Sequence, residues 1–281
     1  MKVSPILIIG KNGKTGARVN QRLQALGYET RPVSRSTNLS FDWEDPTTWA
    51  TALKGVKSAY VTYQPDLAVP NAESTINEFV RIAAEAGLKH IVLLSGRGED
   101  GAQRAEKVLI NSDISWNIVR CNWFSQNFSE SFMVDGILNG ELVLPAADTI
   151  EPFVDADDIA DVVVATLTDP CHRNKLYELS GPRALNFAQC VEEISEALGR
   201  PIKYTTVPVD DYINALHEQG APKDLQWLLR ELFTVVFDGR NSKMVSGIEE
   251  ALGRPATDFK TYVQKAIESG VWNAAIQRQS E

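Results

Sequence analysis

Three glycines at three-residue spacing mark the first place in the sequence where chemistry is expected. Gly10, Gly13 and Gly16 lie in the stretch IGKNGKTGA, residues 9–17, between the apolar run 6–9 and a segment with apolar residues at helical spacing. Glycine permits a positive φ, and a strand-to-helix turn directs backbone N–H groups and a helix N-terminus at an anion. The pattern predicts a pyrophosphate site. The expected cofactor contacts of this turn are Gly10, Asn12, Gly13, Lys14, Thr15 and Gly16.

The spacing favours a dinucleotide over ATP or GTP. A P-loop needs four residues between its first glycine and its GK[ST] group, whereas Gly10 stands only three residues before Gly13, Lys14 and Thr15. GxxGxxG is also looser than the GxGxxG pattern, so a tight turn with a purely structural role remains the alternative reading.

The end of the second expected strand indicates which dinucleotide binds. An NAD site usually has an acidic side chain there, but this chain reads PVSRS, with Arg35 between two serines and no carboxylate until Asp42. Arginine suits a 2′-phosphate, and Lys11 or Lys14 can add to the attraction. We therefore predict NADP(H) in preference to NAD(H). The alternative is that Arg35 is a solvated loop residue.

Strands and helices alternate along the first half of the chain. The apolar patterns predict strands at 6–9, 28–34, 39–41, 58–63, 90–95 and 116–120, with helices between them, and later a helix at 157–168 and a strand at 176–179. This order indicates an α/β fold: a Rossmann-like, doubly wound parallel sheet with a smaller, mostly helical C-terminal substrate lobe. We expect an NADP-binding domain at 1–150 and a lobe at 151–281, partly woven back onto it. Ligands of such sheets bind beyond the carboxyl ends of the strands, near Gly10, Arg35, Tyr63, Ser95 and Arg120.

Composition narrows the class of protein. The 281 residues are 43% hydrophobic and carry 28 basic and 37 acidic side chains, a formal charge of −9 without a basic stripe, so direct nucleic-acid binding is not expected. No apolar stretch approaches the roughly 20 residues that span a bilayer, and the start does not resemble a signal peptide; a cytoplasmic, membrane-free protein is expected. The spacing of Cys121, Cys171 and Cys190 indicates neither disulfides nor a metal site.

The chain resembles the NmrA-like branch of the atypical short-chain dehydrogenases over nearly its whole length. The motifs are GKNGKTG, LLSGRGE, AEKVLINSDISWNIVRCNWFSQNF, PFVDADDIADVVVATLTDP, YELSGPRALNF and LGRP. Within this family it looks most like bacterial relatives of the fungal clavine dehydrogenases, which are NADPH-dependent reductases of ergot alkaloid formation.

The resemblance implies a role for each matching residue. The three glycines would hold the pyrophosphate, Arg35 would face the 2′-phosphate, and Asp42 would lie near the adenine. Ser95 and Lys107 would stand beside the nicotinamide. The substrate side would be lined by Trp123, Phe124, Gln126 and Asn127. We interpret Asp157 and Asp158, which belong to a family signature with Asp155, as helix N-terminal residues and not as catalysts.

One departure from short-chain dehydrogenases bears on the chemistry. Their Tyr-x-x-x-Lys pair donates a proton, but here Gln103 stands four residues before Lys107, and no tyrosine has a lysine four residues later. Hydride addition to an iminium needs no proton donor, and addition to a quinone leaves a stabilised phenolate. Catalytic roles for Lys107 and for Tyr63, the phenol expected to reach the cofactor, are therefore hypotheses. For Lys107 a surface ion pair is as plausible.

Aromatic side chains would position such an acceptor and exclude water. Trp123, Phe124 and Phe153 are the candidates, with Asn127 beside them, although each aromatic residue can equally be core. The sequence thus predicts an NADPH-dependent reductase that transfers a hydride to an electron-poor small molecule such as an iminium or a quinone. It would be a monomer or a homodimer. The alternative is a catalytically silent NADP(H)-binding redox sensor that acts through a protein partner.

Overall fold

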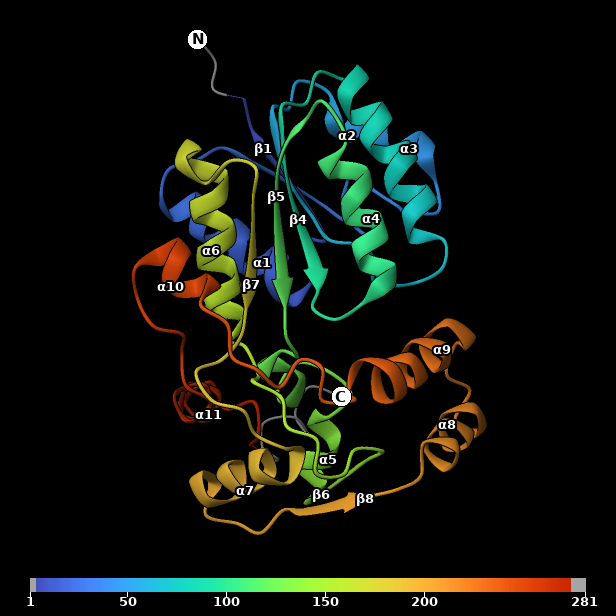
Figure 1. Ribbon diagram of the computed structural model, residues 1–281, viewed down its shortest axis with the longest axis vertical. Coiled ribbons are helices and arrows are strands. Elements are labelled where there is room, and N and C mark those ends of the chain that lie inside the picture. The colour runs from blue at the N-terminus through green and yellow to red at the C-terminus, as the bar shows by residue number, and fades with distance from the viewer. Residues whose placement is uncertain (1–3, 274–281) are drawn as a thin grey trace. The chain divides into compact units, whose positions relative to one another are not determined.

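The structure, a computed structural model, describes residues 4–273 and divides into two compact units that each draw on separate parts of the chain (Figure 1). The first unit contains the chain up to Cys121, together with Ala156–Leu179 and Ser246–Arg254. The second contains Asn122–Asp155, Ser180–Val245 and the chain from Pro255 onward.

The first unit is built on a six-stranded parallel sheet with the order β2-β1-β3-β4-β5-β7. Its strands are β1 (Ile6–Ile9), β2 (Thr30–Val33), β3 (Ser58–Val61), β4 (His90–Gly96), β5 (Ser115–Cys121) and β7 (Lys175–Leu179). All four residues of β1 are buried, as expected for a central parallel strand. Pro32 is tolerated in β2 because β2 is the edge strand of this sheet.

Helices cover both faces of this sheet. Helices α1 and α6 pack together on one face, and α3 and α4 pack together on the other, where α2 also lies (Figure 1). The helices of this unit are α1 (Lys14–Ala25), α2 (Trp49–Leu53), α3 (Ala72–Glu85), α4 (Asp100–Ile110), α6 (Ala156–Thr168) and α10 (Gly247–Leu252), with 3-10 turns at Pro46–Thr48 and Pro170–His172. The predicted doubly wound α/β fold is confirmed.

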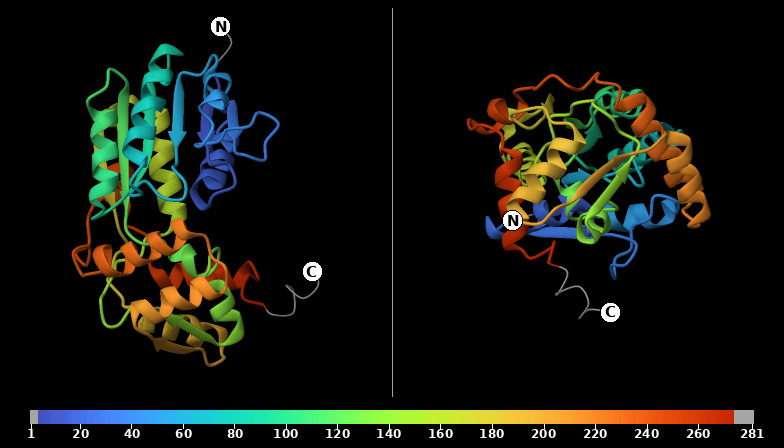
Figure 2. Two further views of the ribbon diagram at one scale, coloured as in Figure 1. Left: turned by 90° about the vertical axis from the view of Figure 1, so that its right-hand side faces the viewer. Right: turned by 90° about the horizontal axis from the view of Figure 1, so that it is seen from below.

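The second unit is mostly helical around a small parallel sheet of β6 (Glu141–Leu144) and β8 (Lys203–Thr206). Figure 2 shows α7 beside this sheet. Its helices are α5 (Val134–Asn139), α7 (Phe187–Leu198), α8 (Val209–Glu218), α9 (Lys223–Glu231) and α11 (Phe259–Glu268), with a 3-10 turn at Ser125–Phe128 and a π-helical turn at Leu232–Val236.

The expected strand at residues 39–41 is wrong. Residues 35–41 form a turn in which the Thr37 hydroxyl donates to the carbonyl oxygens of Ser34 (2.8 Å) and Leu39 (2.7 Å). Phe41 is buried against Trp49, so its apolar character reflects core packing and not a strand.

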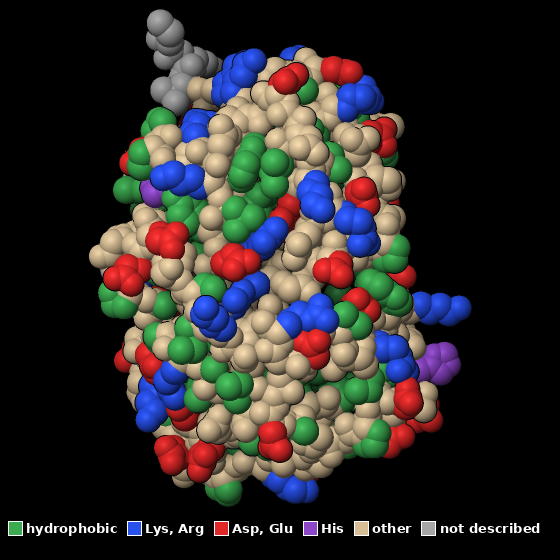
Figure 3. All heavy atoms as spheres, in the orientation of Figure 1, with side chains coloured by type: hydrophobic (Ala, Val, Ile, Leu, Met, Phe, Trp, Pro, Cys, Tyr) green, Lys and Arg blue, Asp and Glu red, His purple; other side chains and the backbone are tan. Residues whose placement is uncertain are grey.

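No helix within residues 4–273 is both long and apolar enough to cross a membrane. Basic and acidic side chains are interspersed on the face drawn in Figure 3, and no broad basic patch occurs there.

Candidate functional site

The turn between β1 and α1 joins the carboxyl ends of two adjacent strands. Gly10 has φ +86°, and the N–H groups of Gly10 and Lys11 both donate to the carbonyl oxygen of Val33 at the end of β2 (3.1 Å each). The N–H of Gly13 donates back to the Gly10 carbonyl at 2.9 Å. The turn is therefore held by its own backbone and needs no side chain to shape it.

Two of the glycines are required by close backbone approach. A Cβ at Gly10 would collide with the hydroxyl of Thr62, which itself donates to the Ile9 carbonyl at 3.1 Å. A Cβ at Gly16 would collide with the Gly10 carbonyl. Bare backbone is thus needed at these positions for the first turn of α1 to lie against the end of β1.

The start of α1 is suited to an anion. The helix begins at Lys14, so the N–H groups of its first turn have no acceptor inside the helix. Gly13 precedes it without a capping side chain, and its first turn contains no acidic residue. Backbone donors without an acceptor inside the helix, the helix dipole and the glycine cradle together fit a pyrophosphate.

Thr15 has a structural partner that the sequence did not indicate. Its hydroxyl accepts a hydrogen bond from the Tyr60 hydroxyl of β3 at 2.9 Å, and both side chains are buried. Tyr60 and Thr62 of the β3 segment therefore bind both sides of the turn, through Thr15 and the Ile9 carbonyl. Both residues have a hydroxyl group near the end of β3, and this polar group in an apolar strand is the sequence feature that could have identified them.

Polar side chains gather at the end of β2, beside the glycine turn. The Asn12 amide donates to the hydroxyls of Ser34 (3.3 Å) and Ser36 (3.1 Å). Arg35 lies between these serines and is exposed, and none of residues 4–273 forms an ion pair with it. This arrangement brings two hydroxyls next to the glycine turn, with the exposed Arg35 between them in the chain.

Asp42 lies farther along the same loop and is half-buried. Its carboxylate accepts the Glu44 N–H at 3.1 Å, and its carbonyl accepts the Trp49 indole N–H at 2.6 Å. The residue shapes the turn that leads to α2.

Tyr63 follows β3 and is largely buried against Trp43, with ring centroids 4.9 Å apart. Burial raises the pKa of the Tyr63 phenol, and a hydrogen bond to Thr75 of α3 opposes that rise. The phenol is therefore held in the protonated form.

Ser95 and Lys107 do not come together. The Ser95 hydroxyl donates to the buried Glu106 carboxylate at 2.6 Å, and Glu106 binds Arg120 of β5 at 2.5 Å. Lys107 is exposed in a hollow between α3 and α4 that also includes Asn77. Ser95 therefore belongs to a buried ion-pair network, and Lys107 to the outer face of α4.

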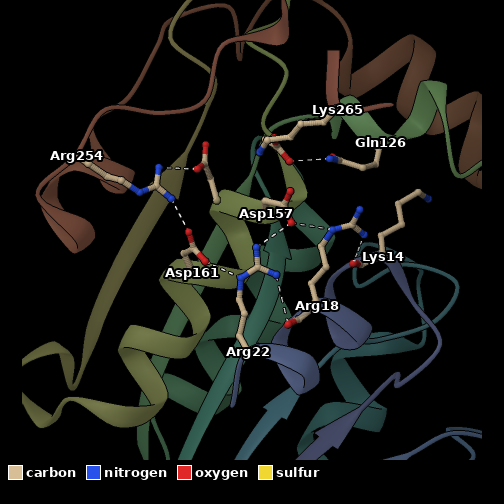
Figure 4. Close-up of polar contacts among 10 residues, drawn as sticks. Lys14, Arg18, Arg22, Gln126, Asp157, Asp161, Arg254 and Lys265 are labelled. Carbon is tan, nitrogen blue, oxygen red and sulfur yellow. Dashed lines mark hydrogen bonds and ion pairs between the residues drawn. The ribbon is translucent and has the colours of Figure 1, made fainter. Parts of the chain in front are cut away.

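The acidic residues at 157 and 158 lie in the first turn of α6, which confirms their predicted position at a helix N-terminus. Asp157 binds the guanidinium groups of Arg18 (3.2 Å) and Arg22 (2.8 Å), and Arg22 also binds Asp161 at 2.6 Å (Figure 4). Since both arginines belong to α1, these ion pairs hold α1 against α6.

Two of the expected substrate-side aromatics are core residues of the second unit. Trp123 packs against Phe233 (5.2 Å) and Phe187 (5.6 Å), and Phe153 also packs against Phe187 (5.2 Å). Both are largely buried. Phe124, by contrast, is half-exposed.

The two polar residues expected on the substrate side, Gln126 and Asn127, also differ in burial. The buried Gln126 amide donates to the Asp155 carboxylate at 2.6 Å, and Lys265 lies 3.7 Å from the other oxygen of Asp155 (Figure 4). Asn127 is half-exposed. Phe124 and Asn127 are thus the members of this group that present surface to a ligand.

Comparison with known proteins agrees with these observations. The family model described as the NmrA-like family matches residues 2–264. The chain is a member of the NmrA-like family.

Proteins similar in sequence to this NmrA-like protein include a differentiation protein, an azoreductase and a dehydrogenase. It is 27% identical to Prestalk A differentiation protein A of Dictyostelium discoideum, over 91% of this chain and 84% of the relative. It is 26% identical to NAD(P)H azoreductase of Xenophilus azovorans and 27% identical to agroclavine dehydrogenase of Claviceps fusiformis, in both cases over 92% of this chain and 96% of the relative.

Solved structures share the fold of this NmrA-like protein. The NADPH complex of the Escherichia coli quinone oxidoreductase QOR2 has a TM-score of 0.77 at 21% identity, over 93% of this chain and 99% of that one. The NADP(H) complex of Citrobacter sp. triphenylmethane reductase has a TM-score of 0.74 at 19% identity, with the same coverage.

Proposed function

We propose that this NmrA-like protein is an NADPH-dependent reductase that delivers hydride to an electron-poor small molecule, such as an iminium or a quinone. Relatives named azoreductase and agroclavine dehydrogenase support an oxidoreductase. The observation that carries the proposal is the glycine cradle of Gly10 and Gly16 at the start of α1, which suits a dinucleotide pyrophosphate.

The preference for NADP(H) rests on the end of β2. Arg35 is exposed, and the hydroxyls of Ser34 and Ser36 stand close by, joined through Asn12. A 2′-phosphate would receive a charge-assisted hydrogen bond from the guanidinium and further bonds from the hydroxyls. An NAD ribose would gain less here, because the end of β2 carries Arg35 and two serines and no acidic side chain.

The proposed class of acceptor rests on the sequence having no Tyr-x-x-x-Lys pair to donate a proton. When bound, the nicotinamide supplies a hydride, and a cationic or quinonoid acceptor takes it without a Tyr-x-x-x-Lys pair. The exposed position of Lys107 on α4 agrees with this reading, and we assign that residue no proton transfer. We infer that Phe124 and Asn127 contact the acceptor, because they are the half-exposed members of their group.

The test is a fluorescence titration of the purified protein with NADPH and NADH, followed by addition of cyclic iminium ions, quinones and cationic dyes. We expect tighter binding of NADPH and acceptor-dependent loss of its fluorescence. Absence of binding would contradict the assignment of the glycine turn.

A redox sensor is the second candidate. It is favoured by the placement of Ser95 and Lys107, which leaves no serine-lysine arrangement at the strand ends. A sensor would bind NADPH tightly and consume none of it with any acceptor, which separates the two functions in the same titration.

A further inference from the structure

Three side chains of metal-binding type meet between α6 and β7, at a place that has no role in the function proposed above. They are Asp169, Cys171 and His172, and each offers one ligand atom, with these atoms all within 4.8 Å of one another. In the part of the chain that the structure describes, no other group of three His, Cys, Asp or Glu side chains is placed to hold a metal ion. The spacing of the cysteines did not indicate this group, because only one of its members is a cysteine.

The group lies at the opposite edge of the first unit's sheet from the glycine turn. It precedes the first residue of β7, whereas the glycine turn follows the last residue of β1. Since the six strands are parallel, they all begin at one edge of the sheet and end at the other (Figure 1). A metal ion at this place is therefore separate from the proposed cofactor site, and the inference does not rest on the proposed reductase function.

The turn that carries these residues is held by its own hydrogen bonds. The Asp169 carboxylate accepts the N–H of Cys171 at 2.9 Å, which caps the 3-10 turn that follows α6. The buried Asn117 amide of β5 donates to the carbonyl oxygens of His172 at 2.5 Å and Lys175 at 3.0 Å. Both ends of the turn are thus fixed to the sheet or to the helix, so little main-chain ordering is left for an ion to impose.

The His172 ring is oriented as well. Its Nδ1 lies 2.7 Å from the hydroxyl of Tyr177 on β7, and both residues are largely buried. Burial raises the pKa of the Tyr177 phenol, so the hydroxyl keeps its proton. A histidine that binds a metal usually has its second ring nitrogen held by such a hydrogen bond, which fixes the direction of the ring. Tyr177 is therefore suited to be a positioning residue for a histidine ligand.

The other two side chains can close around an ion. Asp169 and Cys171 are both exposed, and the hydrogen bond from the Cys171 N–H lowers the pKa of Asp169, so the carboxylate is ionised. A carboxylate that accepts one N–H keeps further lone pairs for a metal. Ligand atoms of a tetrahedral zinc site lie about 3.3–3.8 Å apart, so side-chain movements of about 1 Å complete the geometry.

We propose that Asp169, Cys171 and His172 bind a zinc ion, with water at the fourth position. Thiolate sulfur, imidazole nitrogen and carboxylate oxygen are all ligands of tetrahedral Zn²⁺, whereas Mg²⁺ and Ca²⁺ require several oxygen ligands. The thiol releases its proton to solvent on binding, and the thiolate and the carboxylate together neutralise the ion. The positive charge of Lys175, which acts on Asp169, therefore faces a neutral complex.

A zinc ion at this turn ties the end of α6 to the start of β7. Asp169 directly follows α6, while His172 is joined to β5 through Asn117 and to β7 through Tyr177. Because the ligands are gathered only in the folded turn, zinc binding stabilises the first unit. Three protein ligands and an exposed position make this binding reversible.

The first measurement uses Co²⁺ in place of zinc, because a thiolate bound to Co²⁺ gives a charge-transfer absorption that oxygen and nitrogen ligands do not give. We expect this absorption when Co²⁺ is added to the metal-free protein, and its loss when Zn²⁺ displaces the cobalt. Cys171→Ser should abolish it, and His217→Gln, which removes an exposed histidine of α8, should retain it. A wild-type protein without this absorption, or Cys171→Ser with it, would overturn the proposal.

Zinc titration calorimetry of matched variants measures the role of each residue. We expect the zinc Kd to rise at least about 100-fold in Cys171→Ser and about tenfold or more in Asp169→Asn, whose amide oxygen can still accept the Cys171 N–H. Tyr177→Phe should raise the Kd about 10- to 100-fold and retain the cobalt–thiolate absorption, because it removes only the bond that positions His172. His217→Gln should leave the Kd unchanged. An unchanged Kd in Asp169→Asn and Tyr177→Phe would contradict the proposed ligand set.

Thermal unfolding distinguishes a built site from adventitious binding. Zinc at 100 times its Kd should raise the wild-type Tm by roughly 5–10 °C, and Mg²⁺ or Ca²⁺ should not. Without metal, Cys171→Ser should unfold at the wild-type temperature because the side chain is exposed, and zinc should no longer shift it. The metal-free Tm of Tyr177→Phe serves as the check on its folding. Equal zinc shifts in the wild type and in Cys171→Ser would mean an adventitious ion only and would overturn the site, whether or not the protein is a reductase.

Discussion

At the scale of single residues, Arg35 has the most direct bearing on cofactor choice. Its side chain is exposed, and its chain neighbours Ser34 and Ser36 have hydroxyls 3.2 Å apart. Replacement by aspartate removes a charge-assisted bond and adds repulsion toward the 2′-phosphate.

We expect Arg35→Asp to raise the NADPH dissociation constant about tenfold or more, from a loss of roughly 1.5–3 kcal/mol, and to change NADH binding little. Fluorescence titration with both cofactors measures this. Arg81→Asp is the matched control, because Arg81 is also exposed but pairs with Glu85 on α3. An unchanged ratio of the two affinities would remove the assignment of Arg35.

A pair of glycine variants separates cofactor binding from backbone strain. Gly16→Ala places a Cβ against the Gly10 carbonyl, whereas Gly27→Ala meets no atom within 4 Å and is strained only by its φ of +82°. Both should lower stability by about 1–2 kcal/mol. Gly16→Ala should also weaken NADPH binding tenfold or more, because it displaces the start of α1. Equal NADPH affinity in the two variants would contradict the cradle.

At the scale of secondary-structure elements, His90 connects three of them. Its ring nitrogens lie 3.0 Å from the Ser115 carbonyl of β5 and 3.1 Å from the Thr166 carbonyl of α6, and the residue is fully buried at the start of β4. Burial and the positive charge of Arg173 lower the pKa of His90 to about 4, although the two carbonyls oppose that shift.

The sign of the resulting pH dependence follows from the lowered pKa. The folded form has a pKa of about 4 and the unfolded form about 6.5, so the unfolded chain binds more protons between these values. The contribution of His90 to stability is complete above pH 6.5 and is lost as pH falls toward 4, by about 3 kcal/mol. We expect His90→Gln to lose this part of the acid sensitivity in urea unfolding measured from pH 7.5 to 4.

The exposed His217 supplies the matched control for that experiment. His217→Gln should keep the wild-type slope of stability against pH. If His90→Gln also keeps it, the pKa of His90 in the folded protein equals that in the unfolded chain, and the lowered pKa is wrong.

Sequence patterns predict some helices and strands of this fold and miss others. β1 and α6 were predicted within one residue of their observed bounds, because β1 is a continuous apolar run and α6 has apolar residues at helical spacing. β6 and β8 were missed because neither is a continuous apolar run, and they pair across about 60 residues of intervening chain. Local periodicity carries no information about such a pairing.

In the candidate site, features that are local in the sequence could be predicted, and contacts between distant segments could not. The shape of the turn between β1 and α1 could be predicted because glycine spacing is a local property of the chain, as could the place of Arg35 after the next strand; their contacts with a cofactor stay a prediction. Contacts between distant segments, such as Tyr60 with Thr15 and Arg120 with Glu106, depend on strand order and on helix packing. No spacing rule joins residues that tertiary structure alone brings together.

At the scale of the whole molecule, ion pairs hold distant segments of the first unit in one fold. Arg254, which follows α10, binds Asp158 (2.7 Å) and Asp161 (2.6 Å) of α6, and Asp161 also binds Arg22 of α1. Figure 4 shows the acidic residues of α6 between the arginines of the two other segments. The position of α1, and with it the proposed anion site at its start, therefore depends on residues more than 200 positions later in the chain.

Because the proposed cofactor site is part of that folded unit, we expect NADPH to stabilise the protein as a whole. At a concentration of 100 times the dissociation constant, a ligand that binds only the folded state adds about 2.7 kcal/mol, which corresponds to roughly 5–10 °C in Tm for a protein of this size. NADH at the same concentration should give a clearly smaller shift, and Arg35→Asp should remove the difference between the two cofactors. Equal shifts with NADPH and NADH in the wild type would mean that the 2′-phosphate makes no net contribution, and NADP(H) preference would have to be abandoned even if both cofactors bind.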